Sequence, residues 1–272
     1  MRLGIFAKTF PGSEPAAVLM AVRQAGYETT QFNLACAGLP AMPDAVPADA
    51  IAAIRAAARS TGVSLAALSG TYNMAHPDKA VRDDGLGRLE AVVETAAALG
   101  IPLVTLCTGS RNAADQWAYH PDNATPAAWS DMAAEMEKAL ALAEAAGVDL
   151  GIEPEQANIV TSAKDATRLI AEMGSRHLKI VFDPANLFEH ATPGEARAIV
   201  AAAIDEAAGH IAMAHAKDRH GDGRFATAGQ GIVDFPDFVA RLKAAGFGGA
   251  LVTHGLSADE APGVAAFLRR LL

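Results

Sequence analysis

Four residues of types that bind metal ions or transfer protons recur at similar spacing in the second half of the chain. Glu153, Asp183, His215 and His254 are separated by 30, 32 and 39 residues, and each stands at the end of a short apolar run. An ionised group at the end of a buried strand is costly unless it is paired, hydrogen-bonded or bound to a metal. Each interval is about the length of one strand–helix unit. The spacing therefore predicts that the ends of consecutive strands bring these four side chains together.

Two carboxylates and two imidazoles form a nitrogen and oxygen ligand set without thiolates, which suits Mn²⁺, Zn²⁺, Co²⁺ or Fe²⁺. Any one of these residues alone could equally be a strand cap that bonds to a loop. Four of them at successive strand ends favour a common metal site. We expect a bound divalent ion, with Mn²⁺ as the first choice and Zn²⁺, Co²⁺, Mg²⁺ or Fe²⁺ as alternatives.

The rest of the chain supplies the elements that such a site needs. A strand-then-helix rhythm occurs eight times, with expected strands at 3–7, 29–33, 63–68, 103–107, 148–152, 178–183, 211–214 and 250–253. The strands are continuously apolar, as parallel strands buried on both faces are. This pattern predicts a (β/α)8 TIM barrel that forms a single domain over residues 1–272. The rival, a doubly wound open sheet that binds a dinucleotide, lacks the Gly-x-Gly-x-x-Gly turn after its first strand.

Helix boundaries follow from capping residues and prolines. Ser13 is expected to cap the first helix, Pro126 to open the fourth, and Thr192 with Glu195 to form a capping box for the sixth. Ser257 and Glu260 are expected to do the same for the last helix. The loop at 108–125 is long enough to suggest a functional role.

Composition limits the class of partner. The net charge of −9 and the pI of about 5.3 argue against nucleic acid and against an anionic membrane surface, both of which need a basic face. Cys36 and Cys107 form no metal motif and are expected to be reduced core residues of a cytoplasmic protein. The first residues do not resemble a signal peptide, and no apolar run is long enough to span a bilayer. A homo-oligomer is compatible with the sequence.

Four motifs carry a resemblance to a known family. They are Gly-Ile-Glu-Pro-Glu around Glu153, Phe-Asp-Pro-Ala-Asn around Asp183, Ala-His-Ala-Lys-Asp around His215, and a Gly-Gln-Gly tail that leads to Asp234. Over almost the whole chain the sequence resembles the xylose isomerase-like TIM-barrel superfamily, the sugar phosphate isomerase/epimerase family. That group includes sugar isomerases and epimerases, inosose dehydratases and endonuclease IV. The resemblance implies a TIM barrel with a divalent metal and a small sugar substrate.

One position departs from the family pattern. In the epimerases of this family the last strand usually ends on a second glutamate, which binds metal and exchanges protons. His254 stands there in this chain, so the paired-glutamate mechanism does not carry over unchanged. Endonuclease IV resembles this chain less, because its trinuclear zinc site has more histidines, one of them where Asn186 stands here.

Further candidates surround the four ligands, each with a purely structural alternative. Glu153 and His254 are the expected catalytic groups, together with Glu155, which could instead be a solvated loop charge. The aromatic ring of Trp117 could stack on a sugar, or it could anchor its own loop. The remaining polar candidates for substrate binding could equally cap loops or form ion pairs; they are Asn73, His76, Arg111, His120, Asn158, Asn186 and Lys217.

The expected activity is isomerisation or epimerisation of a sugar or related polyhydroxy ketone, by proton abstraction next to a carbonyl and a metal-stabilised enediolate. A metal-dependent dehydratase or lyase, acting by β-elimination from a keto-sugar or keto-glycoside, would use the same first step. A barrel that binds sugar without turnover is the third possibility. The absence of a clear phosphate-binding glycine loop favours an unphosphorylated ligand.

Overall fold

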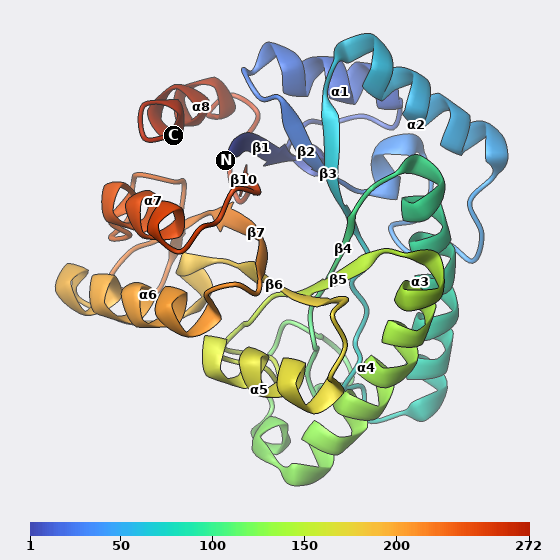
Figure 1. The fold of residues 1–272 in the computed structure, drawn as a ribbon, viewed down its shortest axis with the longest axis vertical. Coiled ribbons are helices and arrows are strands. Elements are labelled where there is room, and N and C mark those ends of the chain that lie inside the picture. Colours follow the sequence, from blue (N-terminus) through green and yellow to red (C-terminus); the bar gives the residue numbers. More distant parts are fainter.

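Eight short parallel strands close into a barrel in the order β1-β10-β7-β6-β5-β4-β3-β2 (Figure 1). The computed structural model describes all of residues 1–272. The barrel strands are β1 (Arg2–Phe6), β2 (Thr29–Phe32), β3 (Ser64–Ser69), β4 (Leu103–Leu106), β5 (Asp149–Ile152), β6 (Leu178–Phe182), β7 (Ile211–Ala216) and β10 (Ala250–Thr253). The predicted (β/α)8 barrel is confirmed.

Eight helices surround the strands (Figure 1). They are α1 (Pro15–Gln24), α2 (Ala48–Thr61), α3 (Lys79–Leu99), α4 (Pro126–Ala146), α5 (Ala163–Met173), α6 (Pro193–Ala207), α7 (Phe235–Ala244) and α8 (Ala261–Arg269). Most of the core lies between the strands and these helices, in a cluster of 63 buried residues. None of the helices is both long enough and apolar enough to cross a membrane.

A second, smaller core fills the inside of the barrel. Seven buried side chains form it, from Ala66 and Ala67 on β3 to Ala250 and Val252 on β10. The space inside is so limited that a Cβ added at Gly151 of β5 would lie only 2.8 Å from Cγ2 of Val181. The barrel is therefore packed solid below the face at which the strands end.

Some expected boundaries are confirmed and others need correction. Pro126 opens α4, and Thr192 and Glu195 form the predicted capping box of α6. Ser13 does not cap α1, because Pro15 fixes the first helical position and Glu14 is the N-cap residue, without a side-chain cap. Ser257 and Glu260 do bond to each other, but they close a turn, and α8 begins after it at Ala261.

The segment between β7 and α7 has more structure than a glycine-rich loop. It contains a short antiparallel pair, β8 (Asp218–Arg219) and β9 (Phe225–Ala226), which folds at the carboxyl end of the barrel. Short 3-10 turns also follow strands at this end, among them η4 (Pro184–Asn186) after β6 and η1 (Ala7–Thr9) after β1. These connections form the walls of the site.

Candidate metal centre and sugar pocket

Four adjacent strands deliver the four predicted ligands to one place. Glu153 follows β5, Asp183 follows β6, His215 lies near the end of β7 and His254 follows β10. One ligand atom from each residue lies within 4.8 Å of the others. Because β5, β6, β7 and β10 are neighbours in the barrel, the strand ends converge as the sequence spacing predicted.

Asp183 is the most deeply buried of the four, with 1% of its surface exposed. One carboxylate oxygen accepts a hydrogen bond from the backbone N–H of Ala185, the first residue after the proline that ends the strand. Burial alone would raise the pKa of Asp183, but the charge of Lys217 and hydrogen bonds from His215 and His254 hold it well below its usual value. Asp183 is therefore an ionised group at neutral pH, as a metal ligand must be.

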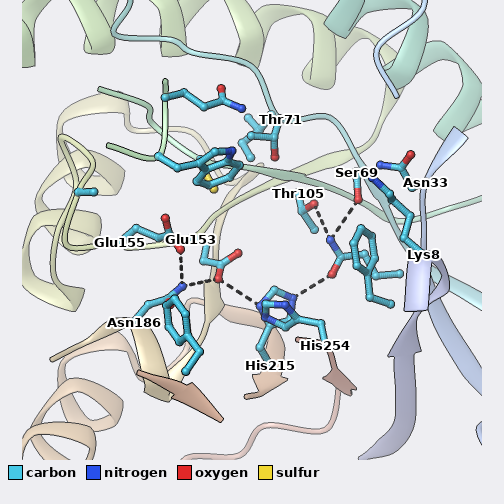
Figure 2. A pocket seen from close by; sticks show the side chains of 18 of the residues that line it. Lys8, Asn33, Ser69, Thr71, Thr105, Glu153, Glu155, Asn186, His215 and His254 are labelled. Atoms are coloured by element: carbon cyan, nitrogen blue, oxygen red, sulfur yellow. Dashed lines mark hydrogen bonds and ion pairs between the residues drawn. The ribbon is translucent and has the colours of Figure 1, made fainter. Parts of the chain in front are cut away.

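His215 is held from both sides of its ring. Its Nδ1 lies 3.2 Å from Oε1 of Glu153, and its Nε2 lies 2.9 Å from Oε1 of Gln31 (Figure 2). The same Nδ1 lies 3.7 Å from Oδ2 of Asp183. Burial alone would lower the pKa of His215, but the charge of Glu153 and the hydrogen bonds to both carboxylates raise it to about 9. Without a metal, a protonated imidazole thus balances the two carboxylates.

Gln31, a residue of β2, fixes the orientation of this histidine. Its Nε2 donates to Oγ of Ser69 at 3.2 Å and to Oγ1 of Thr105 at 3.1 Å, so its Oε1 faces His215. In that arrangement Nε2 of His215 carries the proton, and Nδ1 is the nitrogen that can face a metal. Side chains of β2, β3 and β4, on the far side of the barrel, thereby hold the ring of His215 in place.

His254 occupies the position where the family pattern has a glutamate. Its Nε2 lies 3.1 Å from Oδ2 of Asp183, and its ring meets that of His215 edge-on at 4.3 Å between centroids. Burial, followed by the positive charge of His215, lowers the pKa of His254. A neutral imidazole beside an ionised carboxylate can serve as a metal ligand or as a proton acceptor.

The donor set fits a divalent cation. Two carboxylates and two imidazoles converge, and the only fixed positive charge near Asp183 is Nζ of Lys217, 3.9 Å from Oδ2. Nitrogen and oxygen donors of this kind suit Mn²⁺, Zn²⁺, Co²⁺ or Fe²⁺. Glu153, Asp183, His215 and His254 are the residues that would hold the ion.

Asn186 joins the metal centre to a further carboxylate. Its Nδ2 donates to Oε1 of Glu153 at 2.7 Å and to Oε1 of Glu155 at 2.8 Å (Figure 2). Its Oδ1 accepts from Nζ of Lys217 at 3.1 Å. Burial, followed by the charge of Glu153, raises the pKa of Glu155 to about 7. Two carboxyl groups are thus held side by side at the edge of the proposed metal site.

A cavity of about 700 Å³ opens above these groups. Both catalytic glutamates predicted from the sequence, Glu153 and Glu155, line it, and so do His215 and His254. Trp117 and Asn186, predicted as substrate contacts, line it as well. Lys217 lies in the wall behind Asn186, with 7% of its surface exposed.

The other five predicted substrate contacts do not line this cavity, and their side chains hold loops together. Asn73 exchanges hydrogen bonds with the backbone of Ser110, and Asn158 accepts from the N–H of Gly109. Arg111 pairs with Asp131 at 2.6 Å. His76 and His120 bond to backbone groups of their own or neighbouring loops. The structural alternative considered for each of them accounts for these contacts.

Asp218 organises the hairpin over the cavity. Its buried carboxylate accepts four backbone N–H groups, from Arg219, Gly229, Gly231 and Val233, at 2.8–3.0 Å. A Cβ on Gly231 would lie 2.3 Å from this carboxylate, which explains the second glycine of the Gly-Gln-Gly motif. The motif thus serves a backbone cradle.

Most of the lining residues were not identified from the sequence, and three of them, Gln31, Arg219 and Phe225, shape the site. Gln31 lies in the strand sequence Thr-Thr-Gln-Phe, in which nothing marks it as buried or as a partner of His215. Arg219 and Phe225 belong to the hairpin, and both line the cavity. Nothing in a glycine-rich segment indicated that it would fold back over the barrel.

The comparisons with known proteins agree with this architecture. Residues 19–271 match the family model described as xylose isomerase-like TIM barrel, so the chain belongs to that family. A comparison with curated protein sequences gave no match.

Among solved structures, the fold is similar to an L-ribulose 3-epimerase, with a TM-score of 0.79 and 22% identity over 100% of this chain and 94% of that one. It is also similar to 3-keto-D-glucoside 4-epimerase from E. coli, with a TM-score of 0.78 and 18% identity over 99% of both chains. The D-psicose 3-epimerase from Clostridium cellulolyticum H10, with D-tagatose, has a TM-score of 0.75 and 17% identity over 100% and 99%. At these identities the likeness establishes the fold.

Proposed function

We propose that this protein is a divalent-metal-dependent isomerase or epimerase of a sugar or related polyhydroxy ketone, with Mn²⁺ as the expected ion. The observation that carries the proposal is the arrangement of Glu153, Glu155 and His254 around one convergent donor set at the floor of a cavity. The similar structures include epimerases of ketoses and of a keto-glucoside, which supports the same class.

When bound, a divalent ion supplies Lewis-acid chemistry that acidifies the C–H bond next to a carbonyl group. The chain's own residues then have separate roles. Asp183 and His215 hold the centre, and neither has a second role. Glu153 removes or returns the proton, and Asn186 keeps its carboxylate oriented.

Epimerisation also needs a group that acts on the opposite face of the substrate. Glu155 and His254 are the two candidates. Figure 2 shows Glu155 on the far side of Glu153 from the histidines, whereas His254 lies beside His215. The two candidates would therefore approach a substrate at the proposed metal centre from different directions, which supports a role for one of them on the face opposite Glu153.

His254 gives a specific reason to keep a second candidate function. A dehydratase or lyase removes the same proton but then needs an acid to protonate a departing hydroxyl or glycosidic oxygen. An imidazole at the end of β10 that is not bound to the metal can first accept a proton and then return it to the departing oxygen, and His254 stands where the family's epimerases have their second glutamate.

The test is to incubate the Mn²⁺-reconstituted protein with ketoses and keto-glycosides in deuterated water and to follow both exchange and products. Deuterium incorporation at carbon without loss of water or aglycone supports the isomerase or epimerase. An elimination product supports the lyase. No exchange with any of these compounds would contradict both and leave a barrel that binds sugar without turnover.

A further inference from the structure

The cavity is larger than a single sugar ring requires. If each CHOH unit of a sugar takes about the volume of one water, about 30 Å³, a hexose fills roughly a quarter of the 700 Å³ and a two-ring ligand roughly half. The donor atoms at the floor lie within 4.8 Å of one another, so the reacting part of the substrate needs only that region. The remaining space extends toward the rim.

An aromatic ring with no aromatic or cationic partner stands at the rim. Trp117 is 48% exposed, and what distinguishes it from other exposed apolar side chains such as Tyr119 is that its ring lines the cavity. The loop that carries it is fixed by bonds from Asn73, Asn123 and Asn158 to its backbone and to Ser110. The alternative considered from sequence, in which Trp117 anchors its own loop, therefore lacks support, because polar contacts perform that task.

A second aromatic wall comes from the hairpin. Phe225 also lines the cavity and is 52% exposed, and its ring is held by Nζ of Lys217 at 3.5 Å and by the guanidinium of Arg219 at 4.1 Å from the centroid. Only 8% of the surface of Arg219 is exposed, and its Nε has no hydrogen-bond partner. No carboxylate lies within ion-pair distance of its side chain. Because Nε is buried, the donors that Arg219 can offer to a ligand in the cavity are its terminal N–H groups, which form no hydrogen bond or ion pair within the protein.

The order of strands places these two walls on either side of the reacting groups. Trp117 belongs to the loop after β4 and Phe225 to the hairpin after β7. Between β4 and β7 in the barrel lie β5 and β6, which carry Glu153 and Asp183. A ligand that is anchored at the floor and extends outward over β5 and β6 therefore passes between Trp117 and Phe225.

We propose that the substrate is a glycoside, a sugar whose reacting ring sits at the metal centre and which carries a second ring packed against Trp117. The second ring is either another sugar or an aryl aglycone, since both present an apolar face to an indole. Arg219 donates to oxygens of this outer part. This inference rests on the proposed function, because it extends the substrate of the same site.

The test compares a free keto-hexose with keto-glucosides that carry a methyl, phenyl or glucosyl group. The metal-loaded wild-type protein should catalyse deuterium exchange into the phenyl and glucosyl compounds. Its kcat/KM for these compounds should be several-fold higher than for the methyl glycoside and the free sugar. Trp117→Ala should lower kcat/KM roughly two- to tenfold for the two-ring compounds only, the size expected of one aromatic contact. Equal losses for all substrates, or a preference for the free sugar, would overturn the proposal.

The matched control is Tyr119→Ala, because Tyr119 lies in the same loop and is 64% exposed but does not line the cavity. Tyr119→Ala should keep the wild-type preference for the two-ring compounds over the methyl glycoside and the free sugar. Equal melting temperatures of both variants would show that the loop is intact. A loss of preference in Tyr119→Ala of the same size would indicate a general loop effect and count against the proposal.

A binding measurement separates this inference from the proposed function. Trp129→Phe leaves Trp117 as the only tryptophan, so its fluorescence reports the rim. Phenyl glucoside and a diglucoside should change the emission and bind more tightly than methyl glucoside, even if no compound is turned over. If exchange fails with every substrate while this preference holds, the proposed activity is wrong and the two-ring site stands. If all three glucosides bind equally, the two-ring site is wrong.

Discussion

Gln31 and His215 are joined by a hydrogen bond of 2.9 Å that connects β2 to a ligand on β7, across the interior of the barrel. The contact sets which nitrogen of His215 faces the metal centre. Partners of this kind commonly contribute about 10- to 100-fold to metal affinity. Gln31→Leu should therefore weaken Mn²⁺ binding by about that factor, as measured by calorimetric titration.

Gln31→Glu is the control for this prediction, because it retains an oxygen acceptor for Nε2 of His215. The affinity of Gln31→Glu for Mn²⁺ should stay closer to the wild-type value than the affinity of Gln31→Leu does. Unchanged affinity in Gln31→Leu would show that His215 needs no support from β2.

Asn186 controls the geometry of two carboxylates, so its removal should affect turnover more than folding. In Asn186→Ala, Glu153 and Glu155 lose their shared donor and repel each other. We expect kcat to fall on the order of 100-fold, within the range for a misplaced proton-transfer group. Steady-state exchange kinetics would measure this. A kcat within twofold of the wild-type value would show that turnover does not depend on the hydrogen bonds of Asn186 to Glu153 and Glu155.

Asp218 should matter for stability through the four backbone N–H groups that it satisfies. Asp218→Ala leaves buried donors without an acceptor and should destabilise the protein by about 2–4 kcal/mol, or open the hairpin locally. Urea unfolding together with limited proteolysis would distinguish the two. Asp222→Ala is the control, because this exposed hairpin residue bonds only to Arg224 and should change stability by less than about 0.5 kcal/mol.

The buried Glu135 of α4 lies between two cations, with its Oε1 2.7 Å from Nζ of Lys138 on the same helix and 3.8 Å from Nε of the buried Arg82 on α3. Glu135→Leu leaves a buried guanidinium without its counter-charge and should cost about 3–5 kcal/mol. Adding Arg82→Met should recover part of the loss. Glu137→Leu, on the exposed side of the same helix, should have little effect, and an equal effect of both single variants would contradict the pairing.

The convergence of the four proposed ligands was accessible from the sequence because it depends on where strands end. Asp183 is followed by a proline that ends its strand, and its carboxylate must then lie at the carboxyl face of the barrel. The same reasoning placed Glu153, His215 and His254. It succeeded because a parallel barrel gives all strand ends one destination.

Side chains in loops were less predictable, because spacing gives no information on where they point. Asn73 and Asn158 have the same hydrogen-bonding groups as Asn186, yet only Asn186 reaches the carboxylates. Phe225 reaches the cavity through a hairpin whose shape depends on the buried Asp218. Such folding back results from tertiary hydrogen bonds that no local pattern encodes.

The central claim is that Glu153, Asp183, His215 and His254 form one metal centre. Its most direct test is to measure metal content and melting temperature after Mn²⁺ is added to chelator-treated protein, for wild type and for Asp183→Asn. We predict one ion per wild-type chain and a rise in melting temperature, since saturation at 100 times the Kd adds about 2.7 kcal/mol. Asp183→Asn should show neither effect. A wild-type protein that binds no Mn²⁺, Zn²⁺, Co²⁺, Mg²⁺ or Fe²⁺ and melts at the same temperature with and without them would contradict the account.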